Sequence, residues 1–322
     1  MPRVSILTPT WNRSGYIKRV WEGLVSQSYR NFEWIVANDG SADDTAQIIR
    51  DLAAQSDFPI TLINASIRIG KSRMDNEAVR CARGEFILWC DSDDFLLPNA
   101  LETLLNTWES IPESEKGDFA GITALCESQE GILDNVYPQE SHTDVIWNEL
   151  LSKMKFDFVL FARSDLLKKN PFLEVDFLIP ETTVWNILGL KKTRFIPTPL
   201  KCIEYKSANC ISYSGLMEYN RGRAYAMALS RKNLAYKRHG SWQLITFLRY
   251  CIHGDISVLE VINMWREAGG NAALLLFFYP AACLLAMKDE FQSKVRKTHL
   301  QYLQAAKFVK ISVEELKMKA SA

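Results

Sequence analysis

The first hundred residues alternate between short apolar runs and segments with helical periodicity. Apolar runs predict strands at 4–7, 32–37, 60–63 and 86–90, and apolar positions three or four residues apart predict helices at 16–27, 43–54 and 72–81. Strands and helices that alternate at this spacing indicate βαβ units and a mainly parallel sheet. Loops that bind ligands are then expected at the carboxyl ends of the strands.

The pattern changes twice further along the chain. Between 98 and 210 it is less regular, with helices predicted at 101–108 and 182–190 and strands at 119–126 and 158–162. Beyond about 215 it is helical almost throughout. We therefore predict an α/β domain over 1–212 and a mainly α-helical region over 213–322, although no low-complexity linker marks the border.

The most apolar segment, AALLLFFYPAACLLAM, occupies 272–287 in the C-terminal region. It is shorter than the ~20 residues that cross a bilayer upright, and Pro280 interrupts it. Three interpretations stay open: a helix buried in the C-terminal bundle, an interfacial or re-entrant membrane contact, and a true span. Basic residues that follow the segment could lie at anionic lipid headgroups, namely Lys288, Lys294, Arg296 and Lys297.

Composition narrows the function classes. Lys+Arg and Asp+Glu both total 38, so no global basic field points to nucleic acid. The seven cysteines form no CxxC pair, which favours reduced thiols in a cytosolic protein over a disulfide framework or zinc site. The N-terminus, MPRVSILTPT, lacks the long apolar core and cleavage site of a signal peptide, so we expect a cytoplasmic protein.

The sharpest chemical feature is the acidic cluster Asp91-Ser92-Asp93-Asp94, which follows the apolar run FILWC. Three carboxylates so close together repel one another unless a cation lies among them. Mg²⁺ and Mn²⁺ take oxygen ligands, typically one or two carboxylates together with substrate phosphates. The cluster therefore suggests a metal site, and an acidic loop that caps the next helix is the alternative.

Two more polar loops follow predicted strands. Thr8-Pro9-Thr10-Trp11-Asn12 follows the first strand, and Asn38-Asp39-Gly40-Ser41 follows the second. A nucleobase could lie against Trp11, and Asp39 could accept a hydrogen bond from a base imide. Plain turns, with Ser41 or Asp43 capping the next helix, are the alternative. Each loop is a weak signal alone, but all three fall on one edge of one sheet, where they can form a single nucleotide pocket.

Together with Gly70, Arg73, Asn76 and the stretch ARGEFILWCDSDD, these loops resemble the family-2 glycosyltransferases of the GT-A fold. The resemblance is strong over 3–110 and looser to about 206. It implies a Rossmann-like mixed sheet flanked by helices. It also implies that 1–110 binds a nucleotide-sugar, with UDP expected, and that 111–212 forms the acceptor and base region.

The resemblance also implies roles for individual residues. Thr8, Pro9, Thr10 and Trp11 would line the nucleoside site, Asp39 would contact the uracil ring, and Lys71 or Arg73 would lie near the base or phosphates. Asp91, with Ser92 beside it, would lie near the ribose, and Asp93 would bind the Mn²⁺ or Mg²⁺ ion that bridges the diphosphate. The family often has two aspartates before the Gly-Ser, and Asn38 replaces the first here. A cation is also expected on physical grounds, because departing UDP accumulates negative charge.

A base must take the proton from the acceptor hydroxyl. The family's base position corresponds to Glu181, which Thr182 follows where the family often has Asp. The pattern Pro-Glu-x-x-x-Trp resembles a branch found in capsule and exopolysaccharide clusters. We predict that Glu181 is the base. The alternatives are a first-turn carboxylate that stabilises the helix dipole, or Asp176 or Asp157 as the base. Because no second catalytic carboxylate is evident, a single displacement with inversion is expected.

Rival functions explain less of the sequence. Gly70-Lys71-Ser72 resembles the end of a P-loop, but that pattern needs glycine where Ala65 stands, and no GxG supports a dinucleotide oxidoreductase. A sugar nucleotidyltransferase and a non-catalytic protein that binds sugar or nucleotide remain alternatives. The acceptor is expected to be a glycan or lipid-linked saccharide. A basic group in the helical region is either a solvated face or a contact for acceptor pyrophosphate or lipid headgroups: Arg221, Arg223, Arg231, Lys232, Lys237 and Arg238.

Overall fold

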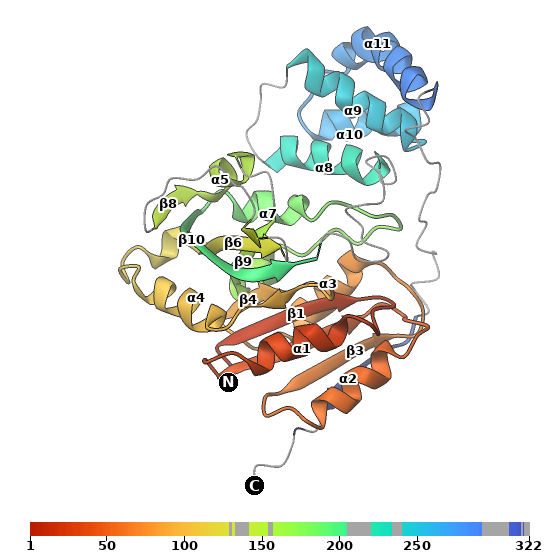
Figure 1. Ribbon diagram of the computed structural model, residues 1–322. Coiled ribbons are helices and arrows are strands. Elements are labelled where there is room, and N and C mark those ends of the chain that lie inside the picture. The colour runs from red at the N-terminus through yellow and green to blue at the C-terminus, as the bar shows by residue number, and fades with distance from the viewer. Residues whose placement is uncertain are drawn as a thin grey trace. The chain divides into compact units, whose positions relative to one another are not determined.

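The computed structural model describes residues 1–128, 131–132, 142–153, 157–204, 220–233, 240–291, 309–316 and 318 (Figure 1). The chain forms two compact units. The first comprises Met1–Pro171, Leu188–Ser207 and Gln304–Ala322, and the second comprises Phe172–Ile187 and Ala208–Leu303. Each unit has its own cluster of buried apolar side chains. The predicted border at 212 lies outside the described residues.

The first unit is built on a mixed sheet whose amino-terminal half is parallel. Four strands lie in the order β3-β2-β1-β4: β3 is Ile60–Ala65, β2 is Phe32–Asn38, β1 is Val4–Thr10 and β4 is Phe86–Trp89. Every residue of β1 and β2 is buried because helices cover both faces of the sheet. The helices α1 (Ile17–Val25) and α2 (Thr45–Ala53) lie on one face, and α3 (Lys71–Cys81) lies on the other (Figure 1). The predicted strands and helices of this half are confirmed to within a few residues.

The other half of the sheet mixes directions. The antiparallel strand β9 (Phe158–Arg163) joins β4 to β6 (Phe119–Ser128), and β10 (Lys192–Ile203) runs parallel to β6. The short β5 (Phe95–Leu96) and β8 (Thr143–Ile146) pair with β10, and β7 (Gly131–Ile132) pairs with β6. Three further helices and one 3-10 turn flank this half: α4 (Ala100–Glu109), η1 (Lys116–Asp118), α5 (Trp147–Lys153) and α6 (Ser164–Lys169).

Strand β10 was not predicted, because its sequence contains Pro197 and Pro199. Proline cannot donate to a strand ladder and usually marks an edge or a bulge. The pairing of β10 with β6 accommodates them by register shifts on both sides of Pro199. The result is the mixed α/β sheet flanked by helices that the sequence predicts.

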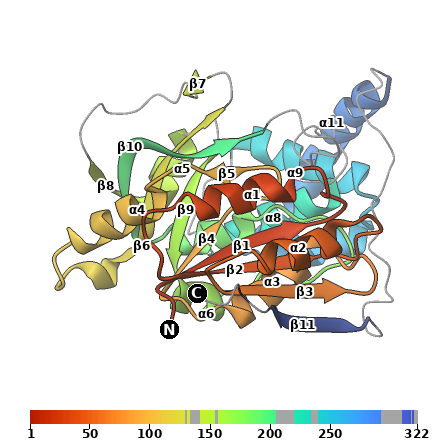
Figure 2. The ribbon, with the colours of Figure 1, turned by 60° about the horizontal axis from the view of Figure 1, so that its bottom comes forward.

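The last strand, β11 (Ile311–Leu316), is also unexpected, since the pattern beyond 215 indicates helix. It pairs antiparallel with β3, from Ile311 opposite Ala65 to Leu316 opposite Ile60, and closes that edge of the sheet (Figure 2). Arg50 on α2 donates two hydrogen bonds to Glu314, at 3.0 and 2.9 Å. An uncovered edge strand would present unpaired backbone groups, so the C-terminal segment protects β3.

The second unit is helical, as predicted for most of the C-terminal region. It contains α8 (Asn220–Asn233), α9 (Ser241–His253), α10 (Val258–Glu267) and α11 (Ala272–Phe291), and most of α7 (Thr182–Leu188). Phe247 of α9 and Trp265 of α10 pack with ring centroids 4.9 Å apart in its core. The Ser257 hydroxyl caps α10 by accepting the N–H of Glu260.

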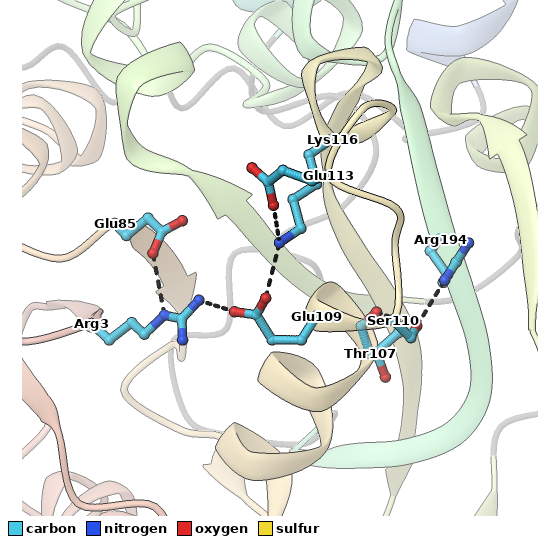
Figure 3. Close-up of polar contacts among 8 residues, drawn as sticks. All are labelled: Arg3, Glu85, Thr107, Glu109, Ser110, Glu113, Lys116 and Arg194. Atoms are coloured by element: carbon cyan, nitrogen blue, oxygen red, sulfur yellow. Dashed lines mark hydrogen bonds and ion pairs between the residues drawn. The ribbon is translucent and has the colours of Figure 1, made fainter.

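A network of ion pairs lies at the amino ends of β1 and β4 (Figure 3). Arg3 Nε lies 3.2 Å from Glu85 Oε2, and the same guanidinium pairs with Glu109 at the end of α4. Lys116 then joins Glu109 and Glu113, each at 2.9 Å. All but Lys116 are substantially exposed, so each pair contributes only about 0–1 kcal/mol. This edge is opposite the polar loops, so we interpret the network as structural.

Candidate active site

Three polar loops of the first unit meet at the carboxyl edge of its sheet. They follow β1, β2 and β4, which are neighbours in the sheet. The connection through α3 returns from β3 past β1 to β4, so the order of the strands reverses beside β1. In open α/β sheets ligands bind in the crevice at such a reversal.

Reciprocal hydrogen bonds join the loops after β1 and β2. The backbone N–H of Asn12 donates to Ser41 Oγ at 2.8 Å, and the N–H of Ala42 donates to Asn12 Oδ1 at 2.8 Å. The N–H of Asp39 donates to the carbonyl of Thr10 at 2.9 Å. Asn12 adopts a left-handed backbone (φ 52°), a conformation that asparagine tolerates better than most residues. The two loops are therefore held together as one side of the candidate site.

The four residues predicted to line the nucleoside site have different surroundings. Thr8 and Pro9 are buried in the sheet, and the Thr8 hydroxyl accepts a 2.9 Å hydrogen bond from Trp34 Nε1. The Thr10 hydroxyl is also buried, yet it has no hydrogen-bond partner within the described part of the chain. A buried hydroxyl without a hydrogen-bond partner, at the carboxyl end of a strand, can form a hydrogen bond with a ligand. Trp11 is only partly buried.

Asp39 binds the loop that precedes α3. Its carboxylate accepts the backbone N–H groups of Ile69 at 2.6 Å and Gly70 at 3.1 Å. Burial raises the pKa of Asp39, although these hydrogen bonds and nearby arginines partly oppose the shift. Gly40 (φ +65°) lies so close that an added Cβ would be 2.3 Å from the Ile67 carbonyl carbon. Asp39 therefore organises the loop at 66–70, and a carboxylate retains acceptor positions for a further donor.

Arg68 lies beside two of the predicted site residues, and the sequence did not predict it. Its guanidinium carbon lies 3.6 Å from the centroid of the Trp11 ring, and its Nε lies 3.8 Å from Asp39 Oδ2. A base that stacks on Trp11 must use the ring's other face or displace Arg68. No local pattern marks this arginine, because only the closure of the 66–70 loop onto Asp39 brings it to Trp11.

Lys71 and Arg73, the two residues predicted as alternatives near the base or phosphates, contact different groups. Lys71 Nζ lies 3.0 Å from Asp75 Oδ2 and 3.8 Å from Asp91 Oδ1, so it reaches the acidic cluster. Arg73 donates instead to the carbonyl of Ile69 at 3.0 Å. Of these contacts, that of Lys71 with Asp91 reaches the acidic cluster, and which cation lies near the base or phosphates stays a prediction.

The three carboxylates of the acidic cluster differ in their exposure to solvent. The side chain of Asp91 is 46% exposed and that of Asp93 is 14% exposed, whereas Ser92 is buried. Arg13 Nη2 lies 3.5 Å from Asp93 Oδ2. Arg13, which follows the Thr-Pro-Thr-Trp-Asn motif, is a second neighbour that the sequence reasoning missed.

Asp94 faces inward and forms a buried ion pair. Its Oδ2 lies 3.1 Å from Nζ of Lys201 on β10, and its Oδ1 accepts the N–H of Glu204 at 3.3 Å. Burial, opposed by Lys201 but reinforced by Asp91 and Asp93, raises the pKa of Asp94 to about 7. Burial alone would lower the pKa of Lys201, but Asp94, followed by Cys126 and Asp91, raises it well above its usual value. Asp94 is thus paired inside the fold, whereas Asp91 and Asp93 lie beside Lys71 and Arg13 at the sheet edge.

The remaining donors suit a divalent cation that arrives with a diphosphate. The described residues hold no group of three His, Cys, Asp or Glu side chains arranged for a metal. Mg²⁺ typically uses one or two carboxylates and takes its other ligands from phosphate and water. Asp93, with Asp91 beside it, fits that requirement, and the metal site stays a prediction.

Glu181 belongs to the second unit, whereas the three loops belong to the first. It precedes α7, and its Oε2 accepts a 3.4 Å hydrogen bond from Trp185 Nε1. In α8, Gly222 packs against the same segment: an added Cβ would lie 1.9 Å from the carbonyl oxygen of Leu178. Of the alternative bases, Asp176 lies in the second unit and Asp157 in the first.

A known protein family matches the part of the chain that contains the amino-terminal half of the sheet. Residues 5–114 match the family model described as glycosyl transferase family 2, and they contain all three loops. These residues form a glycosyltransferase domain of family 2. The predicted family is therefore confirmed.

The chain is similar to proteins whose names place them in glycan synthesis. It is 27% identical over 201 residues to the GalNAc(5)-diNAcBac-PP-undecaprenol beta-1,3-glucosyltransferase of Campylobacter jejuni, covering 61% of this chain and 62% of that protein. It is 38% identical over 106 residues to a chondroitin synthase of Escherichia coli, covering 33% of this chain and 15% of that protein. The match spans less than two thirds of each relative's length.

The fold has a solved counterpart. The crystal structure of S. aureus TarS 1–349 in complex with UDP-GlcNAc aligns with a TM-score of 0.58 at 15% identity, covering 91% of this chain and 93% of that one. The predicted GT-A architecture is confirmed by this likeness, which concerns the fold alone.

Proposed function

We propose that this glycosyltransferase moves a sugar from a UDP-sugar to a hydroxyl of a glycan or lipid-linked saccharide, with Mn²⁺ or Mg²⁺, in the synthesis of a surface polysaccharide. One observation carries the proposal. Asp94 is committed to Lys201, so the acidic cluster offers Asp91 and Asp93 at the edge where the nucleotide loops meet. The name of the Campylobacter relative, which specifies a saccharide on undecaprenol diphosphate, supports a lipid-linked acceptor.

The nucleoside would occupy the wall formed by the loops after β1 and β2. The Thr10 hydroxyl is buried without a partner among the described residues, and Trp11 offers an aromatic face. Asp39 retains acceptor capacity for a base imide. Solved TarS complexes with UDP-GlcNAc and with UDP share the fold and support a UDP-sugar donor.

The diphosphate would lie beside Asp93, with the ribose near Asp91. Lys71 and Arg13 are the cations beside these carboxylates, at 3.8 and 3.5 Å, and both can turn to phosphate oxygens. A divalent ion held by Asp93 would neutralise the charge that develops on departing UDP. Preorganised cations at that position lower the barrier because the charge appears only as the bond breaks.

Transfer requires one proton acceptor and one leaving group. Glu181 would take the proton of the acceptor hydroxyl while that oxygen forms a bond to the anomeric carbon. The bond from this carbon to the diphosphate breaks with its electron pair, and UDP leaves. A single displacement on the face opposite the leaving group inverts the anomeric configuration.

The C-terminal region supports a peripheral contact with the cytoplasmic face of the inner membrane. Among the described residues one helix is long and apolar enough to cross a membrane, at Ala272–Asp289, and only 22% of that window is buried. Lys288 near its end is exposed. An enzyme acting on a lipid-linked acceptor would benefit from such a contact.

A donor screen tests the function. Thermal stabilisation and donor hydrolysis would be measured for UDP-, GDP- and CDP-sugars, each with Mn²⁺ and with EDTA. We expect UDP-sugars with Mn²⁺ to give the largest effect. Stabilisation without turnover on any acceptor or water would favour a non-catalytic binding protein. Consumption of UTP and a sugar 1-phosphate would favour a nucleotidyltransferase.

A further inference from the structure

Helix α11 is apolar around its whole circumference, yet the protein covers only one side of it. Leu275, Ala282 and Ala286 are buried, and they recur at the seven- and four-residue spacings of one helical face. This face packs within the apolar core of the second unit, together with Leu244 and Phe247 of α9. An all-round apolar helix normally needs an apolar environment on every side.

The opposite face is open. Leu276, Phe277, Leu284 and Met287 are 66%, 75%, 69% and 66% exposed. At 100° per residue these four fall within one arc, centred opposite Leu275, and the exposed Lys288 lies beside them. The helix therefore presents a continuous apolar strip to its surroundings.

Polar contacts of Asp289 at the end of α11 determine which face of the helix is exposed. Asp289 accepts hydrogen bonds from Arg249 of α9 at 3.1 and 2.7 Å, and it lies 3.1 Å from Nε2 of His253. Burial would raise the pKa of Asp289, but these hydrogen bonds outweigh it and lower the pKa. Because the ionised carboxylate is held at the end of the buried face, α11 cannot easily roll about its axis to hide the strip.

Two occupants of the strip are disfavoured by physical arguments. If α11 crossed the membrane by itself, all of its sides would face lipid. One side is instead packed on α9 and ends at the ion pair of Asp289 with Arg249. A second copy would need about 800 Å² from each partner, but one half of the lateral surface of a 20-residue helix offers only ~500 Å², from its length and diameter. A lipid surface needs no such area, since an interfacial helix buries its apolar face only ~5–10 Å deep.

We propose that α11 lies flat in the membrane interface, with the second unit on one face and lipid on the strip of Leu276, Phe277, Leu284 and Met287. This inference specifies the membrane contact of the proposed function and rests on it. Lys288 and the basic residues that follow in the sequence, Lys294, Arg296 and Lys297, match anionic headgroups in charge.

The test is sedimentation of the full chain with vesicles of zwitterionic and anionic phospholipid in a three-to-one ratio, at low salt. The variant Phe277→Ser/Leu284→Ser removes two large side chains from the strip. The matched control, Val258→Ser/Leu259→Ser, removes two exposed apolar side chains from α10 of the same unit. We expect the strip variant to bind vesicles at least about tenfold more weakly because two large apolar groups no longer enter the interface, with the control unchanged.

Unchanged vesicle binding of the strip variant, or no binding by the wild-type chain, would overturn the inference. A wild-type dimer in light scattering that the strip variant loses would assign the strip to a second copy instead. UDP binding and donor hydrolysis, measured on the same samples without vesicles, should be equal in all three proteins. If the wild type neither bound UDP nor hydrolysed a donor, the proposed function would be refuted. The vesicle result would still show whether the exposed face of α11 contacts lipid.

Discussion

Lys201 of β10 lies 3.1 Å from Asp94, the last residue of the acidic cluster, and both side chains are buried. The pair joins residues far apart in the sequence, and it fixes the cluster to the second half of the sheet. The pair therefore holds one carboxylate of the cluster inside the fold, while the side chains of Asp91 and Asp93 are more exposed.

The first prediction concerns this ion pair. Lys201→Met leaves the Asp94 carboxylate buried without its partner, so we expect the free energy of unfolding to fall by about 3 kcal/mol. The double variant Lys201→Met/Asp94→Leu removes both charges and should recover most of that loss. Urea unfolding measures both effects. A single variant as stable as the wild type would show that the pair contributes nothing.

The pH dependence of stability provides a second prediction. The pKa of Asp94 is raised to about 7, above its unfolded value, so the folded state binds the proton more tightly. The contribution of this group is fully present below the unfolded pKa of about 3.9 and is lost as the pH rises through about 7. Relative to Asp94→Asn, the wild type should therefore lose stability between pH 4 and pH 7. If the free energies of unfolding of the two proteins differed by the same amount at every pH in that range, the raised pKa of Asp94 would be contradicted.

The third prediction concerns β11. Deleting residues 309–322 exposes the edge of β3 and removes the pairing of Arg50 with Glu314. We expect a lower unfolding temperature and concentration-dependent aggregation. Arg50→Ala in the intact chain is the milder comparison and should cost only about 1 kcal/mol or less. An unchanged unfolding temperature after the deletion would mean that β11 does not protect the edge.

This strand also affects how the membrane contact is tested. Truncation near 215 would remove α11 and β11 together, so loss of membrane binding could not be assigned to either. Substitutions on the exposed face of α11 avoid the problem.

The sequence predicted the amino-terminal half of the sheet well because each strand there is a continuous apolar run covered on both faces. The three loops could be assigned to one edge from the βαβ order alone. The partners of the site residues could not be predicted, since Lys201 and Asp94 meet only through β10, and Arg68 reaches Trp11 only through the closure of 66–70. The same holds for β11, which depends on a partner strand about 250 residues earlier.

The fourth prediction tests the base. Glu181→Gln keeps the shape of the side chain and can still accept from Trp185, but it cannot take up the proton. Turnover should fall by about 10²–10⁴-fold, with UDP binding nearly unchanged. Turnover close to wild type would exclude Glu181 and turn attention to Asp176 and Asp157. Loss of both turnover and UDP binding would indicate a structural role.

The most direct test of the central claim is UDP binding by calorimetry, with Mn²⁺ and with EDTA, in the wild type and in Asp93→Ala. Asp93 is partly exposed at the sheet edge, so its removal should leave the fold intact, and Glu85→Gln at the opposite edge is the control. We predict that Mn²⁺ strengthens UDP binding to the wild type and to the control but not to Asp93→Ala, which also loses transfer. Normal transfer by the wild type in EDTA, or Mn²⁺-dependent UDP binding by Asp93→Ala, would contradict the account.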